Sequence, residues 1–122
     1  MRLSLLLALA LAGCAAPGGR WVKTELFFGT ARPDGTAVTR REWQTFVKSE
    51  IVPRFPGGFT LLEGRGWWRT ARGEPVDEDS RLLVLIHRPE DAGRISAVRQ
   101  RYKERFRQES VLQVTHPVRA EF

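Results

Sequence analysis

The segment Arg81–His87 (RLLVLIH) limits the possible folds of this chain more than any other stretch. Its five central residues are all aliphatic, with no polar residue among them. A strand that is apolar on both faces lies inside a sheet, with neighbouring strands at both edges and other elements packed against it. We therefore expect a central β-strand here, in a sheet covered by at least one further layer.

The flanking sequence predicts helices on both sides of this strand. Trp21–Gly29 (WVKTELFFG) alternates as a strand. Thr39–Glu42 then forms a capping box that starts a helix, which ends before Pro53. Pro89 and Asp91 open a second helix after the central strand. Its apolar residues recur at helical spacing: Ile95, Val98, Tyr102 and Phe106.

Two segments between the first helix and the central strand predict one interrupted strand. Phe59–Leu62 is the first half and Trp67–Ala71 the second, with an interruption at Glu63–Gly66. The interruption is expected because glycine inside a strand marks a bulge or a tight turn. Arg72–Ser80 is polar and contains Gly73 and Pro75, so it is expected to be a connecting loop.

A last strand at Val111–Thr115, with Val118–Phe122 as a candidate extension, completes the order β-α-β-β-α-β. This order predicts an α+β fold, the ferredoxin-like βαββαβ sandwich. Its four-stranded antiparallel sheet carries both helices on one face, because two amphipathic helices need one shared apolar surface. The opposite face of the sheet is then expected to be open.

The first twenty residues predict an export signal. Met1-Arg2 precedes an apolar run that is too short to span a bilayer, and Leu11–Cys14 (LAGC) resembles the bacterial lipobox. We expect residues 1–13 to be a lipoprotein signal peptide, 14–20 the lipidated cysteine and a short tether, and 21–122 one α+β domain. Two alternatives are an ordinary signal peptide with an incidental cysteine and a buried N-terminal helix.

The lipobox also predicts where the protein is found. Acyl chains on Cys14 would anchor it to a membrane on the extracytoplasmic side of the bacterial envelope. Ala15 follows the cysteine, and the absence of an aspartate there favours the outer membrane. Secretion argues against a nucleic-acid role despite the formal charge of +6. The scattered arginines are interpreted mainly as solvated surface, with contact to anionic lipid as the alternative.

Strand alternation suggests one polar constellation. If the residues pointing away from the helices include Glu25, Arg69 and His87, these three would converge on the open face. A carboxylate, a guanidinium and an imidazole together can bind a polar ligand or transfer protons. Trp68 beside Arg69 could add a stacking surface. The alternative is a structural Glu–Arg ion pair with a histidine at the edge.

No other catalytic or metal-binding pattern is present. The two histidines and the single cysteine do not form a metal-ligand set, and no cofactor motif occurs. The favoured hypothesis is therefore a non-catalytic binding or interaction domain. A second copy is one expected partner, contacted through Phe27, Leu83 and Leu85 on the sheet face. The alternative is a small enzyme or small-ligand carrier with a polar site on that face.

Several motifs also resemble those of a known family. They are Glu25–Gly29, Glu42–Phe46, Pro53–Thr60, Trp68-Arg69, Ser80–Val84 and Tyr102–Leu112. Together they are similar to the bacterial domain-of-unknown-function family three-five-seven-four, over nearly all of the chain after the tether. The resemblance implies a small secreted or lipid-anchored protein. It implies no reaction and no catalytic residues.

Overall fold

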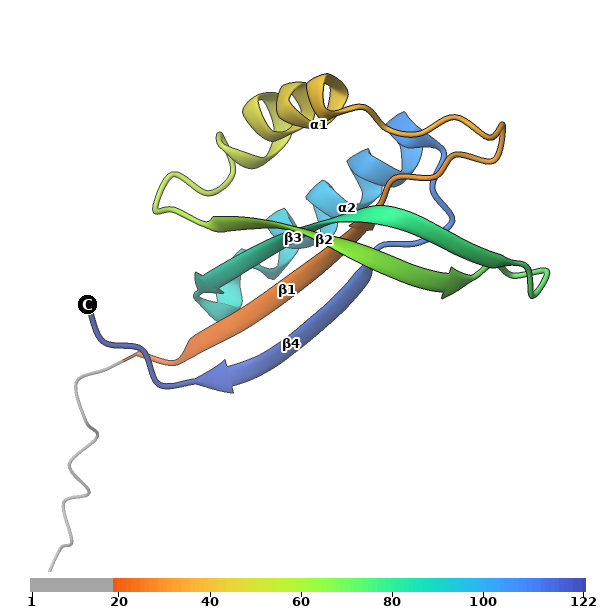
Figure 1. Ribbon diagram of the computed structural model, residues 1–122. Coiled ribbons are helices and arrows are strands. Elements are labelled where there is room, and N and C mark those ends of the chain that lie inside the picture. Colours follow the sequence, from red (N-terminus) through yellow and green to blue (C-terminus); the bar gives the residue numbers. More distant parts are fainter. Residues whose placement is uncertain (1–18) are drawn as a thin grey trace, which may run out of the picture.

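The computed structural model describes residues 19–122, which form a four-stranded antiparallel sheet with both helices on one face (Figure 1). The strands lie in the order β2-β3-β1-β4, so β3 and β1 are central. The predicted ferredoxin-like arrangement is confirmed, as is the central position of Arg81–His87. The elements are β1 Trp21–Gly29, α1 Arg40–Phe46, a π-helical turn Val47–Ile51, β2 Thr60–Arg69, β3 Pro75–His87, a 3-10 turn Pro89–Asp91, α2 Ala92–Phe106 and β4 Leu112–Val118.

The capping box starts α1 as the sequence predicts. The backbone N–H of Glu42 donates to Thr39 Oγ1 over 3.2 Å, and the Glu42 carboxylate accepts from the Thr39 backbone N–H over 2.8 Å. This backbone N–H and the Arg32 guanidinium hold the pKa of Glu42 below its usual value. Two amides that the first turn would leave unpaired are thereby satisfied.

Aromatic rings fill the space between the helices and the sheet. Phe28 of β1 lies 4.7 Å from the ring of Tyr102 and 5.2 Å from that of Trp43, between centroids. Phe46 and Phe106 extend the cluster, and all five side chains are buried. Burying one such ring contributes on the order of 2 kcal/mol, so this cluster holds the helices on that face of the sheet.

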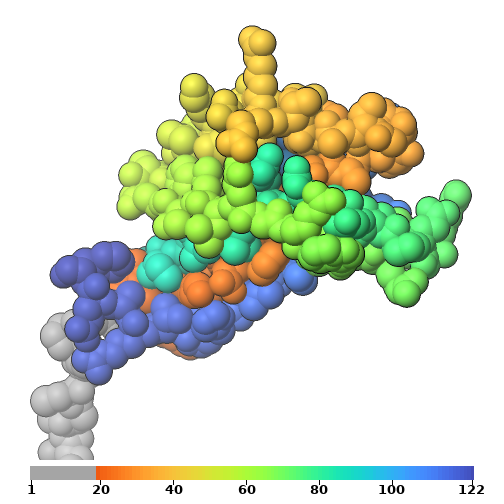
Figure 2. Space-filling model, in the orientation of Figure 1, coloured from red at the N-terminus to blue at the C-terminus, as the bar shows by residue number. Residues whose placement is uncertain are grey.

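The β2–β3 hairpin is longer than the sequence suggests. β2 continues without interruption through Glu63–Gly66, and β3 already begins at Pro75, so only residues 70–74 turn the chain. Gly64 pairs with Ser80 and Gly66 with Glu78, which keeps both glycines in the ladder. The expected interruption and the expected loop at 72–80 are therefore wrong. Figure 2 shows the hairpin tip projecting beyond the body of the protein.

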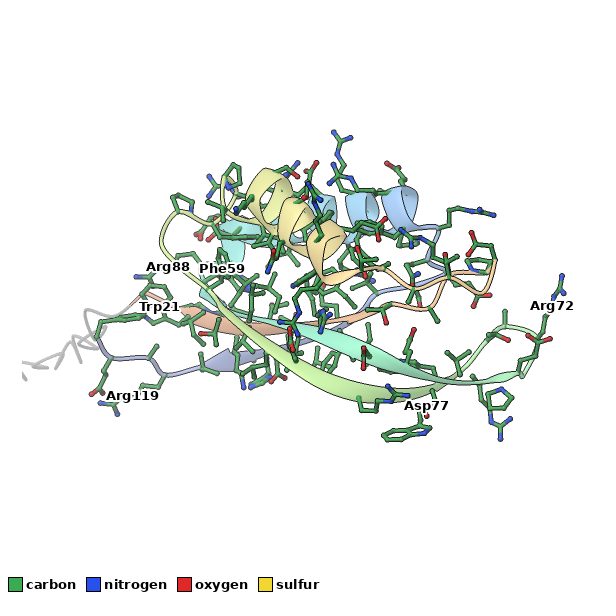
Figure 3. All side chains as sticks on the ribbon, turned by 45° about the horizontal axis from the view of Figure 1, so that its top comes forward. Trp21, Phe59, Arg72, Asp77, Arg88 and Arg119 are labelled. Carbon is green, nitrogen blue, oxygen red and sulfur yellow. The ribbon has the colours of Figure 1, made fainter. Side chains whose placement is uncertain are left out.

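The last strand runs from Leu112 to Val118, so the expected extension through 118–122 does not form. Beside its end, the Arg88 guanidinium lies 3.5 Å from the centroid of the Trp21 ring (Figure 3). Within residues 19–122, no helix has the length and apolar character needed to cross a membrane. The predicted signal peptide and Cys14 fall outside the described residues.

Candidate functional site

The three polar residues expected to converge do not meet. Glu25 lies on the open face of the sheet, in an ion pair with Lys23 (3.1 Å). It is opposite Val84 of β3, whereas Arg69 is opposite Pro75. Nine residues of strand separate these two positions, a span of about 30 Å. The expected Glu25–Arg69–His87 site is therefore wrong.

His87 lies on the helix-covered face, where its side chain is only 7% exposed. Its Nδ1 is 2.7 Å from the carbonyl oxygen of Arg88, and its Nε2 is 2.8 Å from Thr24 Oγ1. A carbonyl only accepts, so Nδ1 carries a proton and Nε2 accepts from the threonine hydroxyl. Thr24 also contacts Thr115 Oγ1 over 2.9 Å. These contacts make His87 part of a buried structural hydrogen-bond chain.

Leu83 and Leu85 lie on the same helix-covered face as His87, so the expected contact with a second copy through these two residues is wrong. Both are buried beneath the helices, together with Leu26 and Phe28 of β1. Each face of the central strand carries at least two aliphatic residues, so hydrophobicity alone could not assign the faces. The open face instead presents Leu82, Val84 and Ile86.

Antiparallel register arranges the open face in rows across the sheet. One row is apolar on all four strands and consists of Leu62, Leu82, Phe27 and Leu112. The next contains Thr60, Val84, Glu25 and Val114, and the third contains Ile86, Lys23 and His116. We use "open face" for these eleven residues. The side chains of Leu62, Leu112, Val114 and Ile86 are between 37 and 51% exposed.

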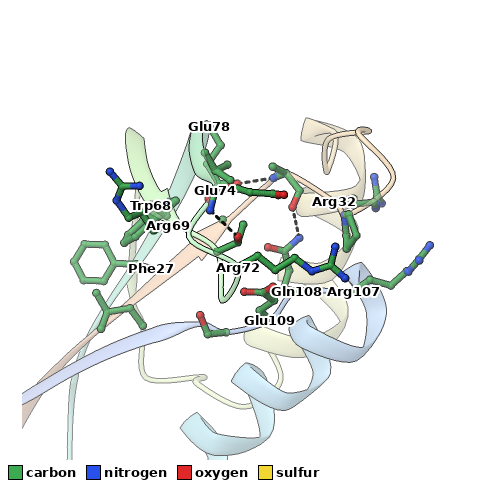
Figure 4. A pocket seen from close by; sticks show the side chains of 17 residues that line it. Phe27, Arg32, Trp68, Arg69, Arg72, Glu74, Glu78, Arg107, Gln108 and Glu109 are labelled. Atoms are coloured by element: carbon green, nitrogen blue, oxygen red, sulfur yellow. Dashed lines mark hydrogen bonds between the residues drawn. The ribbon is translucent and has the colours of Figure 1, made fainter.

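Beyond the apolar row, the adjacent row consists of the small residues Gly64, Ser80 and Gly29. Gly29 also lines a pocket of about 560 Å³ between the hairpin tip and residues 107–112 (Figure 4). We call it the hairpin pocket. Phe27 and Trp68 lie on one side of it, and Gln108 and Glu109 on the other.

Glu78 fixes the inner wall of the hairpin pocket. Its Oε2 accepts hydrogen bonds from the backbone N–H groups of Thr30 (2.9 Å) and Ala31 (2.6 Å). A side chain on Gly29 would collide with this carboxylate and displace it from its two backbone donors. Beneath it, the Tyr102 hydroxyl donates to the Gly29 carbonyl over 2.6 Å. Burial, and then the charge of Glu78, raise the pKa of Tyr102.

Of the predicted site residues, Trp68 and Arg69 both line the hairpin pocket. Trp68 lies over Gly66, and its buried Nε1 has no hydrogen-bond partner among residues 19–122. Trp67 points to the opposite face, as alternation requires, but it is 71% exposed because the hairpin extends past the helices.

Sequence reasoning missed the other members of the pocket. Glu78 falls in the segment that the sequence predicts as a connecting loop, although it lies within β3. The signal that points to the pocket is Gly29, whose proximity to Glu78 follows only once the register of β1 and β3 is known. Within residues 19–122, no group of three or more metal-ligating side chains gathers.

Solved structures confirm the fold class. A phage SAM lyase in complex with S-methyl-5'-thioadenosine is similar with a TM-score of 0.62 and 21% identity, over 86% of this chain and 93% of that one. CutA from Pyrococcus horikoshii gives a TM-score of 0.55 at 14% identity, over 83% and 87%. CutA1 from Oryza sativa gives 0.51 at 11%, over 86% and 85%. At these identities the likeness concerns the fold alone.

No curated protein sequence matches this chain. One family model matches it over residues 23–122, which includes every helix and nearly every strand residue described above. The chain therefore belongs to the family described as "Protein of unknown function (DUF3574)".

Proposed function

We propose that this protein is a lipid-anchored domain of the bacterial cell envelope that binds a second copy of itself through the open face. The observation that carries the proposal is the apolar row that crosses all four strands with no element covering it among residues 19–122. Contiguous apolar surface of this kind marks interaction sites. The role is non-catalytic.

The charges of the open face favour a partner with the same surface. Apart from His116, Lys23 and Glu25 are the only ionisable residues of the open face. Their side chains form an ion pair with each other. A second copy turned by a two-fold axis would bring apolar row against apolar row without placing unpaired charges in the contact.

The dimensions of the sheet predict a weak interface. Four strands about 4.8 Å apart and about seven residues long cover on the order of 440 Å² in projection. Two copies together would bury roughly 900 Å², not counting the extra area of side chains that project from the sheet. This area lies near the lower bound for specific contacts. Interfaces of this size are typical of weak, transient association.

The anchor supports a role for such weak pairing. If Cys14 is lipidated, the six residues 15–20 reach at most about 20 Å before β1 begins. The domain then stays near the bilayer, where two-dimensional confinement raises the effective concentration of its copies. Mass spectrometry of the native protein should find acylated Cys14 as its first residue. An unmodified N-terminus would contradict the anchor.

Self-association is tested on residues 19–122, which contain every described strand and helix. Sedimentation velocity from 1 to 200 μM should show a concentration-dependent dimer. Val114→Glu places a charge on the open face and should leave a monomer. Val52→Glu is the matched control, because Val52 is similarly exposed (47%, against 39% for Val114) but lies outside the open face. A wild-type monomer at 200 μM, or equal effects of the two variants, would refute the proposal.

A second candidate function is a small-ligand carrier or enzyme that uses the hairpin pocket. It is favoured by the pocket itself, which lies at the end of the open face and is lined by Trp68 and Arg69. A phage SAM lyase of similar fold is known in complex with S-methyl-5'-thioadenosine, so this uncharged nucleoside is a first probe of the shape of the pocket. Calorimetry should detect binding that Trp68→Ala abolishes. Absence of heat at millimolar probe would count against this ligand.

A further inference from the structure

We infer that the hairpin pocket is a site for a small organic anion, a ligand with an apolar or planar body and one acidic group. The inference rests on the second candidate function, a ligand in this pocket, and specifies the chemistry of that ligand. The inference compares two groups of side chains in the pocket: those whose charge already has hydrogen-bond partners in the protein, and those whose charge does not.

The acidic side chains of the pocket are largely satisfied. Glu78 accepts two backbone N–H groups, from Thr30 and Ala31. Glu109 Oε2 accepts the backbone N–H of Ala71 across the mouth of the pocket. These two carboxylates keep their charge, but their oxygens already accept charge-assisted hydrogen bonds from the protein. Glu74 is left as the one pocket carboxylate without a side-chain hydrogen bond among residues 19–122.

Three of the four pocket arginines are in the opposite situation, since only Arg32 is paired with a carboxylate, that of Glu42. Arg69 donates only to the Gly73 carbonyl, and within residues 19–122 neither Arg72 nor Arg107 forms an ion pair. Arg72 lies at the hairpin tip (Figure 3) and Arg107 directly after α2, so the two arginines reach the pocket from different segments (Figure 4). Glu74, Glu78 and Glu109 balance the charge of these three arginines, but the guanidinium groups keep hydrogen-bond donors that no carboxylate among residues 19–122 accepts. Guanidinium groups recognise carboxylates, sulfonates and phosphates by charge-assisted hydrogen bonds.

The apolar part of the ligand is inferred from the apolar residues that line the pocket. Phe27, Trp68, Val76 and Leu112 offer apolar and aromatic surface. A volume of about 560 Å³ lies within the usual range for small-molecule sites, and such sites combine an apolar lining with a few orienting polar groups. A ring would contact Phe27 and Trp68 while its acidic group faces the arginine rim.

Two probes of nearly the same shape separate charge from shape. 8-Anilinonaphthalene-1-sulfonate is anionic, and N-phenyl-1-naphthylamine has the same rings without the sulfonate. We expect Arg72→Gln/Arg107→Gln to weaken binding of the anionic probe about tenfold, or about 1.4 kcal/mol, and to change binding of the neutral probe less than twofold. Arg41→Gln/Arg101→Gln is the matched control, because it removes two exposed charges elsewhere and should change neither probe more than twofold.

The Trp68→Ala variant decides whether the probes occupy this pocket at all. It should weaken both probes, and Trp68→Phe replaces it if the alanine variant fails to fold by circular dichroism. If neither probe responds to the change at Trp68, the pocket function itself fails. If both respond but the two arginine pairs have equal effects, the pocket binds ligands and only the inference of an anion is overturned.

Discussion

The hydrogen bond from Tyr102 to the Gly29 carbonyl links the aromatic core to the floor of the hairpin pocket, and Tyr102→Phe removes it alone. The ring and its contacts with Phe28 and Phe46 remain. What is lost is one buried bond of 2.6 Å. An unsatisfied buried carbonyl costs about 1–2 kcal/mol.

This cost converts into a measurable melting shift. A domain of this size has an unfolding entropy near 0.2 kcal/mol/K, so the melting temperature should fall by about 5–10 °C at pH 7. Urea denaturation followed by circular dichroism should give the same loss of unfolding free energy. The matched control is Thr36→Val, which removes an equally short (2.6 Å) but exposed hydroxyl bond to Asp34 and should cost less than about 0.5 kcal/mol.

The pKa of Tyr102 provides a second measurement. Because burial raises the pKa above 10.0, the folded state retains a proton that the unfolded state loses at high pH. The contribution is fully present below pH 10 and is lost as pH rises further. Wild type should therefore lose more stability than Tyr102→Phe between pH 10 and 11. A melting shift below about 2 °C at pH 7, together with parallel pH profiles, would refute this reasoning.

Two further predictions concern other buried or capping groups. The pKa of Glu42 is lowered, so its contribution is present above pH 4.5 and is lost as pH falls through the folded-state value. Melting curves from pH 6 to 3 should therefore converge for wild type and Glu42→Gln, and curves that stay parallel would contradict this. Thr24→Val leaves His87 Nε2 without its donor and should lower the free energy of unfolding by about 1–3 kcal/mol. Thr115→Val, at the exposed end of the same chain of hydrogen bonds, should cost less; equal losses would mean that the His87 contact contributes nothing.

The architecture could be predicted because each helix and most strands carry local signals. The capping box at Thr39–Glu42 and the helical stripe ending at Phe106 need no long-range information. The aliphatic run at 82–86 indicates a central strand by composition alone, and the order of elements then limits the topology to few choices.

The predicted site failed because it required register as well as pattern. Alternation separates Leu83, Leu85 and His87 from Leu82, Val84 and Ile86, but both sets are apolar enough to face the helices. One residue of ambiguity exchanges the two faces of a strand. Glycines within β2 had the same effect, since Gly64 and Gly66 resemble a break until their partners on β3 are known. The hairpin pocket depends on both facts and was therefore not visible in the sequence.

The position of β1 has a mechanical consequence. It begins at Trp21, runs between β3 and β4, and is hydrogen-bonded along both edges. A pull on the chain preceding Trp21, directed along the strand, loads these two ladders in shear, so many hydrogen bonds must rupture together. An edge strand pulled sideways would open one bond at a time, so the fold resists traction where a surface attachment would apply it.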